Sequence, residues 1–346
     1  MSHAFRQGVN PGNTYGHRIT WDIDCPRSAV AAFVGRADYD EPSIFLPENM
    51  LREARRQRGL PAGKVPDVCL LDPDGDIVRH LVREARADRS ASWACYHTEL
   101  WETDYDNIRM GIVGCAVGAS FAVLVAEELF ASGCEFVVSM TSAGQIAPDL
   151  ELPCVILIDR ALRGEGTSHA YLPPALVVDA DPDLIAAVDA SLDGVAVRTL
   201  RGTTWTTDAP FRETRTALAA AATAGALAVE MEAAALYALA AARDRPVVCF
   251  AYVTNTMAIA EGDFEKGPSD GAEQALSVVA AAASGWLLHR QREERSSARM
   301  PHSSAGVLTS PTSSPHAPRC GERRQREIAS PLFSPRYGRT HDTGCS

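Results

Sequence analysis

The stretch AVEMEAAALYALAAA, Ala228–Ala242, places two carboxylates around one methionine at the start of an otherwise apolar segment. Alanine, leucine, methionine and glutamate dominate it, and these residues favour a helix. On a helix Glu230 and Glu232 would project about 200° apart, so they cannot serve one face. Acidic residues in a first turn interact favourably with the helix dipole, by about 0.3–1 kcal/mol. This interaction alone could explain both carboxylates, and the rest of the sequence is needed to decide.

Outward from this stretch, apolar runs that favour strands alternate with segments of helical spacing. Strands are predicted at residues 68–71, 108–113, 135–140, 154–159, 226–229 and 247–253, and helices at 46–59, 77–87, 119–132, 184–192, 214–223, 271–288 and over the quoted segment. This alternation predicts an α/β fold in which a mixed sheet carries helices on both faces, a three-layer αβα sandwich.

The 346 residues have the composition of a globular protein, with 46% hydrophobic and 22% charged residues. The net charge of −11 and the pI near 5.3 argue against nucleic acid and anionic membranes as partners. No run approaches about 18 apolar residues, so no membrane span is expected. Nine scattered cysteines form no CxxC pair, which favours reduced thiols and a cytoplasmic location and predicts no metal site.

Changes in composition predict three regions. Residues 1–40 lack periodicity and are expected to form an irregular extension without a signal peptide, and residues 41–288 carry the alternating pattern of the folded domain. Residues 289–346 are rich in Ser, Pro and Arg and are predicted to be a disordered tail. A solvated appendage explains the basic tail better than a nucleic-acid contact does.

Two glycine-containing turns follow predicted strands. In GIVGCAVGAS, residues 111–120, Gly114 and Gly118 would let the backbone approach a ligand, although the spacing is neither GxGxxG nor a P-loop. In SMTSAGQIAP, residues 139–148, Thr141 and Ser142 precede a turn closed by Pro148. Ligands bind at the carboxyl ends of strands in open α/β sheets, but tight packing and simple turns explain both segments equally well.

Three further polar segments are candidates for a site. The loop at residues 159–174 is denser in functional side chains than a connector needs, which favours a lid or a site wall formed by Arg163, Glu165, Ser168 and His169. In GTTWTTDAPFRET, residues 202–214, Phe211 could stack on a planar base or fill the core. In VTNTMA, residues 253–258, Asn255 could bind the edge of a heterocycle or cap the chain.

The order of these segments resembles the nucleoside phosphorylase/uridine phosphorylase superfamily, which includes the methylthioadenosine nucleosidases. The resemblance runs from about Val68 to Leu288, and VEMEAAALYA and TTDAPFRET are its most specific pieces. TSAGQIAP is similar to the GSAGGLAP of the nucleosidases and to the GTxG turn of the phosphorylases. The resemblance implies cleavage of the N-glycosidic bond of a ribonucleoside, without a metal or an organic cofactor, by a homo-oligomer.

The resemblance also implies roles for individual residues. Met231 would pack beneath the ribose, and Glu232 would accept hydrogen bonds from its 2′ and 3′ hydroxyls, whereas Glu230 would serve the structure. A carboxylate makes charge-assisted bonds to such hydroxyls and stabilises the positive charge that develops at C1′. The base would lie between Phe211, Thr207, Asp208 and Asn255, and the phosphate or water side would be lined by Gly114, Cys115, Gly118, Thr141, Ser142 and Arg79.

Two departures from the family pattern bear on the nucleophile. Ser139 stands where phosphorylases usually carry a phosphate-binding Arg, and LLDPDGDIVRH replaces the GDPxR loop, so that Arg79 is the remaining candidate. Inorganic phosphate is expected as the co-substrate on family resemblance, with water as the alternative. Asn255, where purine members carry an Asp, cannot protonate a leaving base, which favours an oxo-base that leaves as a stabilised anion. A nucleoside-binding protein without catalysis is the third alternative.

Overall fold

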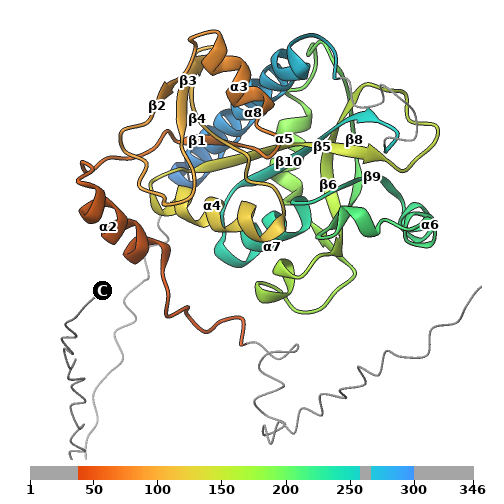
Figure 1. Cartoon of the computed structure of the whole chain (residues 1–346), viewed down its shortest axis with the longest axis horizontal. Coiled ribbons are helices and arrows are strands. Elements are labelled where there is room, and N and C mark those ends of the chain that lie inside the picture. Colours follow the sequence, from red (N-terminus) through yellow and green to blue (C-terminus); the bar gives the residue numbers. More distant parts are fainter. Residues whose placement is uncertain (1–37, 258–265, 300–346) are drawn as a thin grey trace, which may run out of the picture. The chain divides into compact units, whose positions relative to one another are not determined.

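A computed structural model describes residues 38–257 and 266–299 of the chain. Nearly all of the predicted extension at 1–40, and residues 300–346 of the predicted tail, lie outside the described residues. The described part is a mixed α/β fold in which helices cover both faces of a large central sheet, as predicted (Figure 1).

The sheet contains ten strands in the order β10-β6-β8-β9-β5-β1-β4-β3-β2, with β7 paired to β6. The strands are β1 (Val68–Asp72), β2 (Asp88–Arg89), β3 (Trp101–Tyr105), β4 (Ile108–Gly114), β5 (Phe136–Gln145), β6 (Cys154–Gly164), β7 (Val177–Asp179), β8 (Arg198–Thr207), β9 (Ala226–Glu230) and β10 (Val247–Asn255). Strands β1, β4, β5 and β10 run parallel to one another, so their carboxyl ends share one edge.

One half of the sheet closes on itself. Strand β5 pairs with β10 along most of its length and then with β9 through Gly144 and Gln145. Strand β10 also pairs with β6, β6 with β8, and β8 with β9, so these four strands and β5 form a closed ring. The TSAGQ segment, predicted as a turn, is therefore the curved end of a strand.

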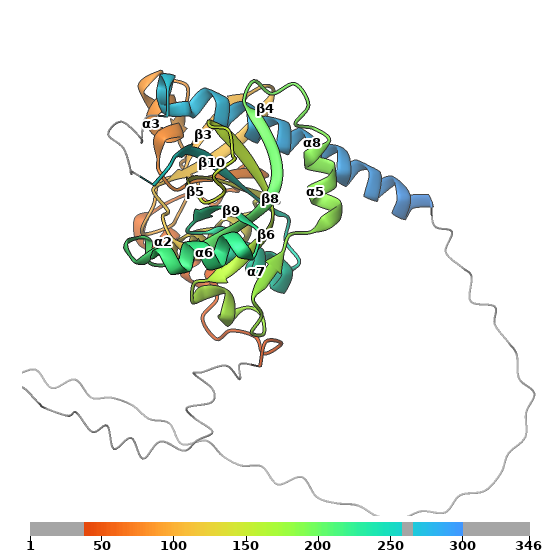
Figure 2. The same cartoon turned by 90° about the vertical axis from the view of Figure 1, so that its right-hand side faces the viewer.

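The helices form two layers (Figures 1 and 2). Helices α3 (Asp76–Arg83), α5 (Pro182–Asp189) and α8 (Ala272–Arg299) pack together on one face, and α2 (Pro47–Arg58), α4 (Ala119–Ala131) and α7 (Ala233–Arg243) pack on the other. Among the described residues there is one further helix, α6 (Arg215–Thr223), which contacts β9. The short 3₁₀ helices of this part are η1 (Thr167–Ala170), η2 (Pro210–Arg212) and η3 (Pro268–Gly271).

Several predicted boundaries differ from the structure. Strand β6 continues to Gly164, inside the predicted polar loop, because it pairs with the unpredicted strand β8 up to Thr207. The quoted segment is a strand up to Glu230 and a helix only from Ala233. Helix α8 runs past the predicted end at Leu288. There Arg290 packs on the Trp286 ring, and side-chain contacts four residues apart support the added turns.

Helix α7 packs closely because most of its buried side chains are alanines, and it contacts β6, β7, β8 and β10. Tyr237 is the large exception. Its buried hydroxyl donates to the Ile158 carbonyl at 2.5 Å and accepts the Cys249 N–H at 3.0 Å. One side chain thus ties the helix to two strands of the ring.

We expect Tyr237→Phe to lower the free energy of unfolding by about 1–3 kcal/mol, because two buried backbone groups lose their partner. Urea denaturation measures the change. Tyr96→Phe is the matched control, since the Tyr96 hydroxyl bonds Gln57 at the exposed surface. Equal losses in the two variants would contradict a structural role for the buried link.

Candidate functional site

Polar side chains gather where the carboxyl ends of β1, β4, β5 and β10 meet the start of α7. In an open α/β sheet such an edge is the usual place for a ligand. The segments brought together are the DPDGD loop after β1, the glycine turn after β4, the curved end of β5 and the two carboxylates at the junction of β9 and α7.

The two carboxylates of the quoted stretch have different surroundings. Glu230 is buried and accepts four hydrogen bonds: from the Thr204 and Thr206 hydroxyls at 3.1 and 2.5 Å, and from the N–H groups of Glu232 and Ala233, both at 2.7 Å. Burial raises the pKa of Glu230, and these four donors oppose that shift. Glu230 therefore fixes the junction between β9 and α7.

Glu232, by contrast, has one carboxylate oxygen that accepts no hydrogen bond from the described residues. It is only 1% exposed, and its Oε1 accepts the Gly118 N–H at 2.7 Å. Its buried Oε2 has no hydrogen-bond partner among the described residues. Burial and the charge of Glu230 raise the pKa of Glu232 to about 8, while Gly118 and Thr141 act in the opposite direction. A buried oxygen without a partner is costly, so this one is suited to a ligand that donates hydrogen bonds.

Gly118 begins α4 with a φ of 90°, which aims its N–H at Glu232. An added Cβ at Gly118 would meet nothing within 4 Å, so the left-handed backbone, not space, requires glycine. Cys115, in the same turn, is exposed and donates its N–H to the Asp72 carbonyl at 2.9 Å. Gly114 ends β4 beside Val78, and the N–H of Gly118 brings this turn into contact with Glu232.

The predicted phosphate or water side contains a carboxylate that the sequence analysis missed. Oδ2 of Asp74 accepts both the N–H of Ser142 at 3.0 Å and its hydroxyl at 2.5 Å. The same oxygen accepts from Nζ of Lys266 at 3.1 Å, and Lys266 also binds Asp76 at 2.5 Å. Arg79, the predicted phosphate ligand, pairs with Asp76.

Asp72 adds a third carboxylate to this region. It is 2% exposed and accepts the N–H groups of Gly75 and Val78 at 3.2 and 3.0 Å. Burial raises the pKa of Asp72 to about 7, with the charges of Asp74 and Asp76 adding to the shift. The DPDGD loop therefore gives the site an acidic character.

The residues predicted to surround a base are only partly brought together. Asn255 is buried at the end of β10, where its Oδ1 accepts the Met257 N–H at 3.0 Å. Thr207 is buried, and Asp208 accepts the Gly166 N–H at 2.8 Å, which ties the end of β8 to the polar loop. Phe211 is 100% exposed and lies against no part of the described chain.

Met231, predicted beneath the ribose, is half-buried between the two carboxylates, in the bend that joins β9 to α7. Its position in the chain brings it to the same edge as Glu232. No contact of its side chain decides whether it faces a ligand, so its role stays a prediction.

The predicted site wall is held together by its own contacts. Arg163 donates to the Ser168 hydroxyl at 2.8 Å, to Nδ1 of His169 at 3.1 Å and to the Pro173 carbonyl at 2.7 Å. Glu165 accepts the Ser168 N–H at 2.9 Å. Burial lowers the pKa of Arg163. These contacts shape the loop, and its role as a wall stays a prediction.

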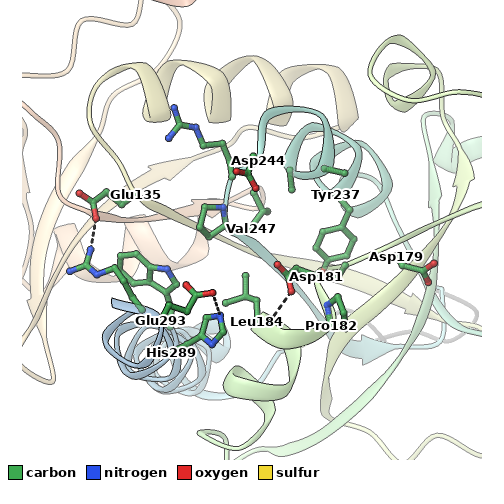
Figure 3. A pocket seen from close by; sticks show the side chains of 17 residues that line it. Glu135, Asp179, Asp181, Pro182, Leu184, Tyr237, Asp244, Val247, His289 and Glu293 are labelled. Atoms are coloured by element: carbon green, nitrogen blue, oxygen red, sulfur yellow. Dashed lines mark hydrogen bonds and ion pairs between the residues drawn. The ribbon is translucent and has the colours of Figure 1, made fainter. Parts of the chain in front are cut away.

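A cleft of about 770 Å³ lies at the other end of the strands (Figure 3). It is lined by residues near the starts of β5 and β10 and by α7 and α8, among them Glu135, Tyr237, Asp244 and His289. None of the predicted site residues lines it. The two carboxylates of the quoted stretch therefore belong to the opposite edge of the sheet.

The described residues offer neither a cluster of metal ligands nor a membrane-spanning helix. Across residues 38–257 and 266–299, no group of three or more His, Cys, Asp and Glu side chains is arranged to hold a metal ion. Within the same ranges, no helix combines the length and the apolar character needed to cross a bilayer.

Comparison with known proteins places the chain in a family. A profile of the phosphorylase superfamily matches residues 67–285, more than half of the chain. The chain belongs to the phosphorylase superfamily. The resemblance inferred from VEMEAAALYA and TTDAPFRET is thereby confirmed, and the matched range is close to the predicted 68–288.

The chain is similar to uridine phosphorylases. The enzyme of Thermococcus kodakarensis is 26% identical over 145 residues, which cover 39% of this chain and 52% of that protein, so the match spans about half of the relative. Two crystal structures of uridine phosphorylase from Vibrio fischeri ES114 have a TM-score of 0.55 and 19% identity. The match to the complex with 6-hydroxy-1-naphthoic acid covers 65% of this chain and 92% of the uridine phosphorylase chain. The match to the second structure covers 72% of this chain and 99% of the uridine phosphorylase chain. At this identity the structures show a shared fold.

Proposed function

We propose that this phosphorylase-superfamily protein cleaves the N-glycosidic bond of a ribonucleoside. The observation that carries the proposal is the buried carboxylate of Glu232, whose Oε1 is held by Gly118 while Oε2 has no partner among the described residues. A ribose diol supplies the two hydroxyl donors that such a carboxylate can accept. The same negative charge stabilises the oxocarbenium character that develops at C1′ as the bond breaks.

The rest of the proposed mechanism is positioning. The rigid junction made by Glu230 holds Glu232 in place before the substrate arrives, so little reorganisation accompanies the reaction. Asn255 can hydrogen-bond a leaving base but cannot give it a proton, which favours a base that departs as a stabilised anion. No metal or organic cofactor is needed for this chemistry.

Two acceptors of the sugar are candidates for this reaction. Inorganic phosphate would give ribose 1-phosphate and is supported by the similarity to the uridine phosphorylases of Thermococcus kodakarensis and Vibrio fischeri. Water would give free ribose and is supported by Ser139 at the position of the expected arginine. Incubation with a nucleoside panel, with and without phosphate, tests both. Thermal stabilisation by nucleosides without turnover under either condition would instead indicate a binding protein.

We also propose that the chain acts as a homo-oligomer in which a neighbour completes the site. The exposed ring of Phe211, predicted to flank the base, supports this, because a large apolar side chain at a binding edge gains from being covered. Light scattering of the purified protein would give the oligomeric state, and a monomer that cleaves nucleosides would reject the proposal.

The pH profile of the reaction follows from Glu232, which must be ionised to grip the diol. Its pKa of about 8 in the free protein lies above the ordinary value of 4.5. We therefore expect kcat/KM to rise as the pH increases and to level off above about 8. Initial rates on a nucleoside across this range measure the profile, and a constant kcat/KM from pH 6 to 9 would contradict it, since roughly a tenfold change per pH unit is expected well below the pKa.

A further inference from the structure

Asp74 occupies the hydrogen-bond donors that an incoming anion would need. Three donors converge on its Oδ2: the N–H of Ser142, the hydroxyl of Ser142 and Nζ of Lys266. A backbone N–H, a hydroxyl and an ammonium around one anionic oxygen are the groups that bind a phosphate oxygen in proteins. Here an internal carboxylate already fills that position.

The charges around Asp74 do not favour a further anion. Asp72, Asp74 and Asp76 come from one short loop, and the cations beside them are Lys266 and Arg79. Both cations are paired with Asp76, and Lys266 is paired with Asp74 as well. Phosphate would therefore meet acids that repel it and cations that are already neutralised.

The space beside this cluster has the size of a water molecule. A cavity of about 20 Å³ is lined by Asp72, Asp74, Thr141, Ser142 and Lys266, together with neighbours from β10 and α8. A single water needs about 10–15 Å³ of such space and two to four polar partners. The cavity and its lining meet the requirement for water and leave no room for phosphate.

We propose that Asp74 excludes inorganic phosphate from this site and makes water the acceptor of the sugar. The proposal rests on the proposed function. The oxygen of water forms a bond to C1′ while the C1′–N bond breaks. The electron pair of the C1′–N bond leaves with the base. The proton that the water loses passes to the departing base through solvent, so the products are free ribose and the neutral base.

Phosphate binding is the direct test, and it does not require turnover. Melting curves of the full chain are recorded against millimolar inorganic phosphate, with potassium chloride at matched ionic strength. Asp74→Ala frees the donors of Ser142. Asp76→Ala is the matched control, because it removes the same charge and one of the two carboxylate partners of Lys266 but leaves Asp74 on Ser142 and Lys266. Asp74→Asn provides a second variant if the alanine protein folds poorly.

We expect no phosphate-specific shift for the wild type or Asp76→Ala, and a saturable shift for Asp74→Ala with about tenfold or greater gain in phosphate affinity. In the nucleoside assay the wild type should release free ribose whether or not phosphate is present. A wild type that binds phosphate, or Asp74 variants that gain none, would overturn the proposal. Absence of cleavage in every assay would reject the proposed function alone, because the phosphate titration is scored independently.

Discussion

Replacing Glu232 by glutamine is expected to lower kcat/KM for a nucleoside by roughly 30- to 1,000-fold, equivalent to about 2–4 kcal/mol of transition-state stabilisation. Glutamine keeps the size of the side chain and can still accept the Gly118 N–H. It loses the negative charge that grips both ribose hydroxyls and stabilises the positive charge at C1′. Steady-state kinetics on the best substrate of the panel measure the loss.

Stability measurements separate this loss from misfolding. The pKa of Glu232 is raised in the folded protein, so its contribution to stability is fully present below about pH 4.5 and is lost as the pH rises through about 8. Glutamine resembles the protonated form at every pH. Glu232→Gln should therefore be at least as stable as the wild type above pH 8, and a destabilised variant with unchanged kinetics would reject the sugar-binding role.

The same substitution two residues earlier should act on stability. Glu230→Gln places an amide NH₂ among groups that all donate to the carboxylate: two threonine hydroxyls and two backbone N–H groups. Whichever carboxylate oxygen the NH₂ replaces, the two buried donors that bonded that oxygen lose their acceptor, which costs about 1–3 kcal/mol. For a domain of this size the melting temperature should fall on the order of 5 °C.

The two glutamine variants are controls for each other. They make one chemical change at two buried carboxylates on either side of Met231, so charge and volume are matched. Thermal melts at pH 7 should show the larger loss for Glu230→Gln. Activity per folded molecule, measured well below the melting temperature, should show the larger loss for Glu232→Gln. A reversed pattern would mean that Glu230, not Glu232, faces the ligand.

The sequence by itself predicted the α/β class, most strand cores and the family. Short apolar runs such as 68–71 and 247–253, separated by helical spacing, leave few other folds, because each element must bury one face. Helix α2 is a local example, since it begins at Pro47 and Gly59 ends it with a φ of 63°. The sequence also separated Glu230 from Glu232, by their helical spacing, and the resemblance predicted a structural role for the first and a sugar-binding role for the second.

The sequence pattern did not predict strand β3, strand β8 or the curved end of β5. Their segments are polar or rich in small residues, so no periodic apolar run marks them. They are strands because neighbouring edges offer backbone partners, as β6 does along all of β8. Pairing of this kind is a property of the assembled sheet, and local sequence does not encode it.

The chemistry of the site was decided by tertiary structure. The acids of DPDGD are visible in the sequence, but nothing local indicates that Asp74 meets Ser142, 68 residues away, or Lys266 beyond β10. Likewise, the sequence VEME does not indicate which carboxylate oxygens accept hydrogen bonds and which one is buried without a partner among the described residues. Sequence sets which groups are available, whereas burial and hydrogen bonding depend on which strand ends the closed sheet brings together, and those surroundings set the pKa and the ligand that a carboxylate can take.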